Sequence, residues 1–209
     1  MTSDFAECAE LGVATMYEAA GRVGVLDLDL HRLLAGSRAA GPARTVRCAQ
    51  DDNLMVHAVI ERIVAGDILV LTMPEPRPVA LIGDLLVTQM IAAGAAGVLV
   101  DASVRDVDDL SRMNLPIWTR WIRVRGAAKR AVGTLDGPVT VGGVTIETGD
   151  LVVLDGDGAC AIAAHRVADT LVAARTREDT ERIARERYRA GEHSYDINRL
   201  REIVEAAHA

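Results

Sequence analysis

The chain has 209 residues, half of them apolar, and a formal net charge of −7 at pH 7. This length suits one domain with a sizeable core, and no apolar run approaches the roughly 18 residues of a membrane-spanning helix. The acidic balance and an aromatic content of 3% weigh against a nucleic-acid partner, because phosphates bind basic surfaces and single strands stack on aromatic rings.

The first half of the chain alternates between helical and strand-like segments. Apolar periodicity and glycine stops predict three helices, at 3–11, 13–20 and 52–65, and two strands, at 43–49 and 68–73. Three prolines then follow within 74–78, where we expect a loop because proline cannot donate to a strand ladder.

The stretch at 82–110 places carboxylates at the ends of its elements. A helix is predicted to begin at Asp84, and the apolar run at 97–100 predicts a buried strand that ends at Asp101. Asp106 precedes a second short helix. Because a helix N-terminus presents unpaired N–H groups, we expect Asp84 and the loop after Asp101 to form one polar pocket.

After residue 110 the pattern changes to short strands and glycine turns. It predicts a strand at 116–124, a hairpin at 139–146 and a second hairpin whose turn is the Asp-Gly-Asp-Gly sequence at 155–158. That turn lacks the downstream glutamate of a calcium loop, so we expect no calcium there. A long helix at 166–190 with alternating charges and a last helix at 196–207 complete the pattern.

No repeat, low-complexity tract or linker divides the chain. We therefore expect one α/β domain at 1–165, with a β-rich second half. Residues 166–209 are expected to form a C-terminal helical extension of the same unit, with the long helix projecting from the domain.

Most familiar catalytic patterns are absent from the sequence, including GK[ST] after a glycine loop, GxGxxG, GxSxG and any zinc-binding spacing of histidines. What remains is Asp84, Asp101 and Asp106, with Arg105 beside the last. Carboxylates suit Mg²⁺ or Mn²⁺, which take oxygen ligands and keep several waters, and Arg105 could hold a substrate carboxylate through two nitrogens. The competing interpretation is that the aspartates cap helices and that Arg105 forms a surface ion pair.

Cysteine usage and the first residues bear on the compartment. Cys8, Cys48 and Cys160 are odd in number and form no CxxC motif, which is typical of a reducing environment. The first eleven residues include acids and no basic residue, so they do not predict a signal peptide. We therefore expect a cytoplasmic protein.

A series of segments carries a family resemblance. In chain order they are 15–22, 41–43 with 45–46, 52–54, 83–86, 97–101 leading into 104–106, 139–150 and 156–158. Together they resemble the RraA-like family, and more narrowly its class II pyruvate aldolases, which act on 4-hydroxy-4-methyl-2-oxoglutarate and 4-carboxy-4-hydroxy-2-oxoadipate. The most specific match is Val-Arg-Asp at its distance after Gly-Asp-Leu-Leu.

The resemblance implies a swivelling β/β/α-type fold and a ring-like homo-oligomer, a trimer or a hexamer, with sites at subunit boundaries. It implies that Asp106 binds the metal, Mg²⁺ or Mn²⁺, that Arg105 holds the keto-acid substrate, and that Asp84 orients a water on the metal. The substrate carboxylate would lie against the backbone amides of four residues, Gly83, Asp84, Leu85 and Leu86.

The same likeness gives the C-terminal helix a role at the metal. Glu181 of a neighbouring subunit would approach the metal through water, and we prefer Glu181 to Glu178. Two segments depart from the family pattern: Ala102-Ser103 stands where glycine and a small residue are usual, and Thr72–Pro78 replaces a glycine-rich segment. Both are expected to border the pocket, so they bear on the identity of the substrate more than on the type of reaction.

The implied reaction is the metal-dependent cleavage of a 4-hydroxy-2-oxo di- or tricarboxylic acid to pyruvate and a second keto acid. It passes through an enolate whose charge needs electrostatic stabilisation, and the same chemistry would decarboxylate oxaloacetate as a side activity. We expect the single lysine, Lys129, to lie outside the pocket, which disfavours a Schiff-base mechanism. The only tryptophans, Trp118 and Trp121, are expected to pack rather than to narrow the pocket.

Two other functions stay open. RraA-like proteins of another branch bind and inhibit ribonuclease E without aldol chemistry, although the C-terminal extension of this chain resembles the aldolases. The third possibility is a metal-dependent decarboxylase or hydratase that acts on another 2-keto acid.

Overall fold

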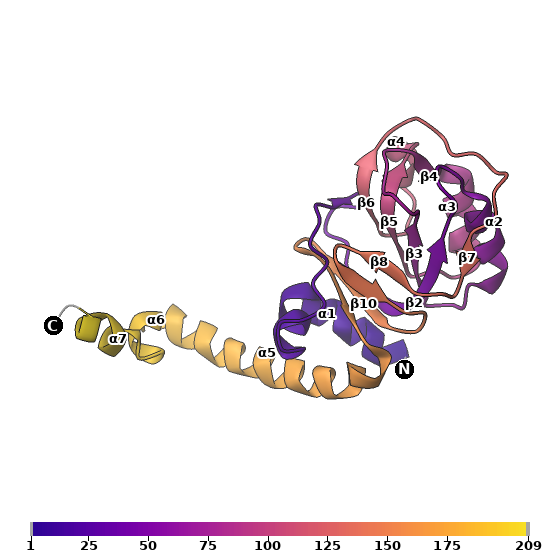
Figure 1. Ribbon diagram of the computed structural model, residues 1–209. Coiled ribbons are helices and arrows are strands. Elements are labelled where there is room, and N and C mark those ends of the chain that lie inside the picture. The colour runs from indigo at the N-terminus through magenta and orange to yellow at the C-terminus, as the bar shows by residue number, and fades with distance from the viewer. Residues whose placement is uncertain (1, 208–209) are drawn as a thin grey trace.

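The computed structural model, which describes residues 2–207, is built around one sheet of nine strands (Figure 1). In chain order these are β1 (His31–Arg32), β2 (Ala39–Arg47), β3 (Ile68–Thr72), β4 (Ala80–Ile82), β5 (Gly97–Val104), β6 (Ile117–Ile122), β7 (Thr134–Leu135), β10 (Leu151–Asp155) and β11 (Gly158–Ile162). A separate hairpin pairs β8 (Val139–Val141) with β9 (Val144–Ile146).

The middle of the sheet is parallel and its two sides are antiparallel. The strand order is β1-β6-β5-β3-β2-β10-β11, with β4 beside β5 and β7 beside β2. β2 belongs to both halves, because residues 39–42 pair antiparallel with β10 while residues 43–47 pair parallel with β3. Every residue of β3 and β5 is buried, which explains why these strands are almost uninterrupted apolar runs in the sequence.

The helices either pack on this curled sheet or extend away from it (Figure 1). They are α1 (Thr2–Ala19), α2 (Leu54–Val59), α3 (Asp84–Ala92), α4 (Val107–Leu110), α5 (Val167–Arg189), α6 (Ser194–Ile197) and α7 (Leu200–Ala207). Val56 of α2 and Val87 of α3 pack with β3 and β5 in one core. In a second core Trp118 and Ile146 join the curled strands to the β8-β9 hairpin, and in a third α1 and α5 cover β10 and β11.

The structure confirms the α/β class and several predicted elements. α1 breaks at Gly12, where φ is 80° and ψ is 171°, so the helices predicted at 3–11 and 13–20 are its two halves. The hairpins predicted at 139–146 and around 155–158 are β8-β9 and β10-β11. α5 spans almost the predicted range.

Other boundaries were wrong. β5 does not end at Asp101 but continues to Val104, because an ion pair with Arg120 lets the buried aspartate remain inside the strand. β4 lies in a segment for which no strand was predicted, since its three residues carry too short a pattern to recognise. The last helix divides into α6 and α7 next to Arg199, whose φ is 56°.

Two further elements differ in length. The helix predicted at 52–65 is helical only over α2, and a 3-10 turn at Ile60–Arg62 follows it. The strand predicted at 43–49 begins earlier, at Ala39, because its first residues pair with β10.

The C-terminal part of the chain leaves the domain. Leu171 and Ala174 of α5 are buried against the third core, but none of the described residues beyond Ala174 is buried. The rest of α5, with α6 and α7, extends away from the sheet (Figure 1). No helix within residues 2–207 combines the length and the apolar character that crossing a membrane requires.

Candidate functional site

The predicted site residues meet at one edge of the sheet because β4 and β5 are parallel neighbours. Ile82 pairs with Val104, so both strands end at the same level. Residues 83–84 and 105–106 therefore leave the sheet side by side, and the Arg105 N–H donates to the Ile82 carbonyl oxygen at 3.2 Å. The carboxyl edge of parallel strands is a common place for ligand sites in α/β proteins.

Asp106 is held in contact with the other residues of this edge. Its backbone is left-handed, with φ 60° and ψ 37°, at the position just before α4. Its Oδ2 accepts a hydrogen bond from the Asp84 N–H at 3.3 Å and lies 3.5 Å from Nε of Arg105. A Cβ on residue 83 would collide with the Asp106 carboxylate, so Gly83 is needed for this close approach.

A pocket of about 100 Å³ opens between this edge, α2 and the loop after β6. Its lining residues are Asn53, His57, Ala80, Leu81, Ile82, Gly83, Asp84, Leu85, Leu86, Arg105, Gly126, Ala127 and Lys129. The structure thus brings together all four residues at 83–86 with Arg105. Asp106 does not line the pocket, but it contacts Asp84 and Arg105, which do.

Three lining residues, Asn53, His57 and Lys129, were missed as site residues, and Lys129 was wrongly expected outside the pocket. Asn53 Nδ2 donates to the Leu81 carbonyl oxygen at 2.8 Å, whereas its buried Oδ1 has no hydrogen-bond partner among the described residues. Burial and the nearby Lys129 charge hold the pKa of His57 below its usual value. The four-residue spacing of Asn53 and His57 was the available signal, because such pairs lie on one helix face.

Asp101 does not belong to the pocket, contrary to the prediction. Its side chain is buried in β5, where it accepts a hydrogen bond from Arg120 Nη1 at 2.8 Å. Burial raises the pKa of Asp101, and the Arg120 charge opposes that shift. The Arg120 guanidinium also stacks over the Trp121 ring, 5.0 Å from its centroid. Trp118 packs in the second core, and its Nε1 donates to the Asp155 carbonyl oxygen.

The two segments that depart from the family pattern do not line the pocket either. Ser103 is buried in β5, and its hydroxyl donates to the Trp121 carbonyl oxygen at 3.0 Å. Neither Ala102 nor any residue of 72–78 contributes to the lining. The expectation that these changes border the pocket was therefore wrong for this chain.

The carboxylates of the edge suit a hard divalent cation that keeps most of its waters. Residues 2–207 contain no group of three or more His, Cys, Asp and Glu side chains arranged to hold a metal ion. Asp106 and Asp84 offer two carboxylates, both at least partly exposed, and Gly83 lets the Asp106 carboxylate lie close to the backbone at residue 83. Mg²⁺ commonly binds proteins through one or two carboxylates, so this donor set fits it, whereas it does not fit zinc.

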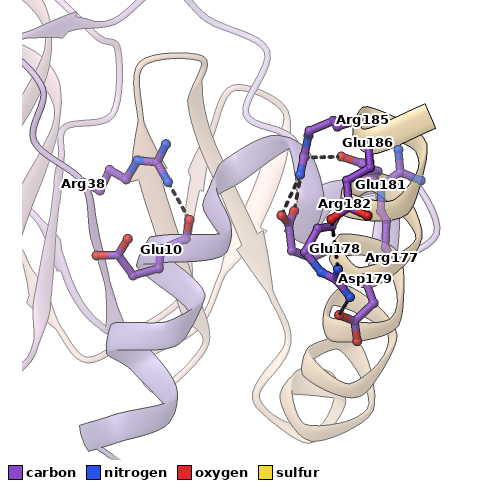
Figure 2. Close-up of polar contacts among 9 residues, drawn as sticks. All are labelled: Glu10, Arg38, Arg177, Glu178, Asp179, Glu181, Arg182, Arg185 and Glu186. Atoms are coloured by element: carbon purple, nitrogen blue, oxygen red, sulfur yellow. Dashed lines mark hydrogen bonds and ion pairs between the residues drawn. The ribbon is translucent and has the colours of Figure 1, made fainter. Parts of the chain in front are cut away.

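Glu181 does not reach this edge within one chain. Its two carboxylate oxygens pair with Nε of Arg177 at 2.9 Å and with Nη2 of Arg185 at 3.0 Å, and Glu178 also pairs with Arg185 (Figure 2). α5 packs on α1, away from the carboxyl edge of β4 and β5 (Figure 1). Only a second copy of the chain could place a C-terminal glutamate near Asp106.

Comparison with known proteins gives consistent similarities over most of the chain. The RraA-like family model, described as Aldolase/RraA, matches residues 5–161, which include the β4-β5 edge. A relative from Halalkalibacterium halodurans, named "Putative 4-hydroxy-4-methyl-2-oxoglutarate aldolase", is 33% identical over 147 residues, 70% of each chain.

Solved structures share the fold. A protein of uncharacterized function from Pseudomonas syringae pv. tomato has a TM-score of 0.82 at 26% identity, with 92% of this chain and 95% of that chain covered. Streptomyces coelicolor RraAS2, described as an unusual member of the RNase ES inhibitor RraA protein family, has a TM-score of 0.75 at 29% identity, with 86% and 96% covered.

Proposed function

The chain belongs to the RraA-like family, and from this premise we propose that it is a class II, divalent-metal-dependent pyruvate aldolase. It would cleave a 4-hydroxy-2-oxo di- or tricarboxylic acid to pyruvate and a second keto acid, with oxaloacetate decarboxylation as a side activity. The observation that carries the proposal is the junction of Gly83-Asp84 with Arg105-Asp106 beside a pocket. The aldolase name of the 33% identical relative supports it.

The 2-oxo acid end of the substrate would bind at the start of α3. Arg105 is half-exposed in the lining and carries a planar fork of donors that matches a carboxylate. The first N–H groups of α3, at Leu85 and Leu86, have no carbonyl partner within the helix and carry the positive end of its dipole. Together these groups favour an anion next to Asp106.

The rest of the pocket suits a second acidic group and a hydroxyl. Lys129 adds a positive charge to the lining, and His57 adds an imidazole whose pKa is held below its usual value by burial and by the Lys129 charge. The unpartnered Asn53 Oδ1 is a buried acceptor, and leaving it without a donor is costly. A water bound beside the C4 hydroxyl of the substrate would supply that donor.

Cleavage requires that the C4 hydroxyl lose its proton while the C3–C4 bond breaks and its electrons move into an enolate of pyruvate. Mg²⁺ or Mn²⁺, held by Asp106, would supply Lewis-acid stabilisation of that negative charge. The Arg105 guanidinium adds a fixed positive charge at the same edge. Asp84, at the rim of the pocket, is placed to accept the hydroxyl proton through water and to return a proton to C3 of the enolate.

We further propose that the protein is a cytoplasmic homo-oligomer, a trimer or a hexamer, in which Glu181 serves a neighbouring subunit. The part of α5 beyond Ala174 supports this assembly, because it contributes no buried side chain to its own domain and still carries the exposed apolar residue Ile183. The three cysteines are buried and free, which suits a reducing compartment.

A pyruvate-release assay tests the proposed function. The substrates are branched 4-hydroxy-2-oxo diacids and oxaloacetate, each measured after EDTA treatment and again with added Mg²⁺ or Mn²⁺. We expect release from a diacid that EDTA abolishes and the metals restore. Full activity after exhaustive EDTA treatment would rule out the metal mechanism, and release from oxaloacetate alone would favour a decarboxylase.

Because Lys129 lines the pocket, a Schiff-base mechanism needs its own test. We expect borohydride to trap no pyruvate adduct, and we expect Lys129→Arg, which cannot form a Schiff base, to retain measurable turnover. An adduct on Lys129 would replace the metal mechanism.

A second candidate function is inhibition of a ribonuclease. It is favoured by the similarity to the Streptomyces coelicolor RraAS2 structure over 86% of this chain. An RNA-cleavage assay with ribonuclease E tests it, and inhibition by a protein that shows no pyruvate release would favour this function over the aldolase.

A further inference from the structure

Asp52 is a buried carboxylate that lies next to the pocket without lining it. Only 2% of its surface is exposed. Its Oδ2 accepts hydrogen bonds from the N–H groups of Arg130 at 2.7 Å and Ala131 at 3.0 Å, and its Oδ1 accepts one from the Leu54 N–H at 2.8 Å. Burial opposes its charge, but these three donors outweigh burial and hold the pKa of Asp52 below its usual value.

These bonds join the two segments that supply one side of the pocket. Leu54 begins α2, and Asn53 and His57 on that segment line the pocket. Arg130 and Ala131 follow directly after Lys129 in the loop after β6.

Backbone bonds hold the same loop on the other side of the lysine. Ala128 N–H donates to the Asp51 carbonyl oxygen at 2.9 Å, and Asn53 N–H donates to the Ala128 carbonyl oxygen at 2.8 Å. The residues before and after Lys129 are therefore both bonded to the start of α2. Ala128, before the lysine, is held by backbone bonds, and Arg130 and Ala131, after it, are held by the Asp52 carboxylate.

We propose that Asp52 is a positioning residue that locks the loop carrying Lys129 onto the start of α2 and thereby sets the affinity for the substrate group that Lys129 binds. The role matters because residues 123–126 and 128–132 are exposed, so few packing contacts hold the loop in place. Hydrogen bonds from N–H groups to a carboxylate are stronger than those between neutral groups. This inference rests on the proposed function, since it concerns the substrate of the same pocket.

The test compares Asp52→Asn with a matched control, Asp150→Asn. Asp150 also accepts two backbone N–H bonds, from Glu147 and Ala164, both at 2.9 Å, but none of these residues lines the pocket. For Asp52→Asn we expect KM for the diacid to rise about tenfold, as for the loss of one charge-assisted contact. Pyruvate lacks the second acidic group, so the kcat for exchange of its methyl protons should stay within about threefold of the wild-type value in Asp52→Asn. Asp150→Asn should change neither constant.

A double mutant tests whether Asp52 acts through Lys129. In a Lys129→Ala background, Asp52→Asn should raise KM for the diacid no further, because the group that it positions is gone. An unchanged KM in folded Asp52→Asn, an equal loss of pyruvate exchange, or full additivity with Lys129→Ala would each overturn the proposal. If Asp52→Asn does not fold, Asp52→Ser, which keeps a short acceptor for the Leu54 N–H, should show the same rise in KM.

Amide hydrogen exchange separates this inference from the proposed function. The amides of Arg130 and Ala131 should exchange faster in Asp52→Asn than in the wild type, whatever reaction the protein catalyses. Faster exchange in a protein without pyruvate release would contradict the aldolase and leave the anchor established. Unchanged exchange would overturn the anchor itself.

Discussion

Three aspartates near the centre of the sequence have three different environments. Asp84 is the first residue of α3 and is half-buried, whereas Asp101 is buried within β5 and paired with Arg120. Asp106 is exposed at the edge of the sheet, where its backbone is left-handed and its carboxylate meets Arg105. Residue type alone therefore does not separate an aspartate of the candidate site from a buried structural one. The position of each aspartate relative to the end of its strand distinguishes the two kinds.

The first prediction follows from this difference. Asp106→Ala and Arg105→Ala should each lower kcat for pyruvate release by at least two orders of magnitude, about 3 kcal/mol of lost transition-state stabilisation. Both side chains are exposed enough for the variants to fold. Steady-state kinetics, with circular dichroism to verify folding, measures the effect.

Asp101→Asn is the matched control. This substitution removes a carboxylate that lies five residues from Asp106 in the sequence and outside the pocket. The kcat for pyruvate release should therefore stay within about threefold of the wild-type value. If Asp106→Ala keeps near-normal turnover, or if Asp101→Asn loses as much as Asp106→Ala, the site is misplaced.

At the scale of an element, α1 shows how a helix can be broken and still be stabilised. The backbone at Gly12 lies in a region that only glycine adopts readily. After the break, the Val13 N–H donates to Asp155 Oδ2 of β10 at 2.9 Å. The carbonyl oxygen of Glu10, which lies before the break, accepts a hydrogen bond from Arg38 (Figure 2). Both new helix ends therefore have partners, as free N–H and C=O groups at helix ends require.

Replacing Gly12 should destabilise the protein without affecting the site. In Gly12→Ala the backbone strain costs about 1–3 kcal/mol of the free energy of unfolding, and the new Cβ would lie 2.7 Å from Asp155 Oδ2. Gly36→Ala is the control, because Gly36 has a φ of 75° but open space at its Cβ position. Chemical denaturation should show a larger loss for Gly12→Ala, and kcat of the folded protein should be unchanged in both. Equal losses would mean that the Asp155 contact is unimportant.

At the scale of the whole molecule, α5 beyond Ala174 and helices α6 and α7 contribute no buried side chain to the domain. Ile183 of α5 and Leu200, Ile203 and Val204 of α7 are exposed apolar side chains. The ion pairs of Glu181 with Arg177 and Arg185 are also exposed, so each contributes little to stability and can be exchanged for another partner. A helix of this kind is better explained by contact with another subunit.

Subunit mixing tests whether the site is shared. Asp106→Ala and Glu181→Ala proteins, each inactive alone, should recover part of the activity after mild dissociation and reassembly together. Recovery is expected because a hybrid oligomer joins an intact Asp106 from one chain with an intact Glu181 from the other. Pyruvate release measures the recovered activity, and native mass spectrometry measures the fraction of hybrid oligomers.

Two outcomes would contradict this assembly. Mixtures shown by mass to contain hybrids but without activity would mean that the site is built within one chain, or that another glutamate serves it. Repeating the mixing with Glu178→Ala in place of Glu181→Ala separates these cases, because recovery would then identify Glu178 as the shared residue.

The sequence by itself predicted most of the local elements and part of the candidate site. Uninterrupted apolar runs predicted β3 and the first half of β5, glycine predicted the break at Gly12, and the turn residues predicted both hairpins. Asp84, Arg105 and Asp106 were identifiable as candidates because each lies at or next to a predicted helix start, whereas Gly83, Leu85 and Leu86 were added by the family resemblance. Such signals depend on a few neighbouring residues only.

Only the tertiary structure decided which distant residues complete the pocket. Lys129 reaches it because its loop bonds to Asp51–Asn53 and to Ala80, contacts that no periodicity in the sequence encodes. Asp101 leaves the predicted site because Arg120, from the neighbouring strand, stabilises it inside β5. In both cases the deciding interaction joins residues far apart in the chain or on different strands. Its energy depends on burial and geometry, which exist only once the sheet has formed.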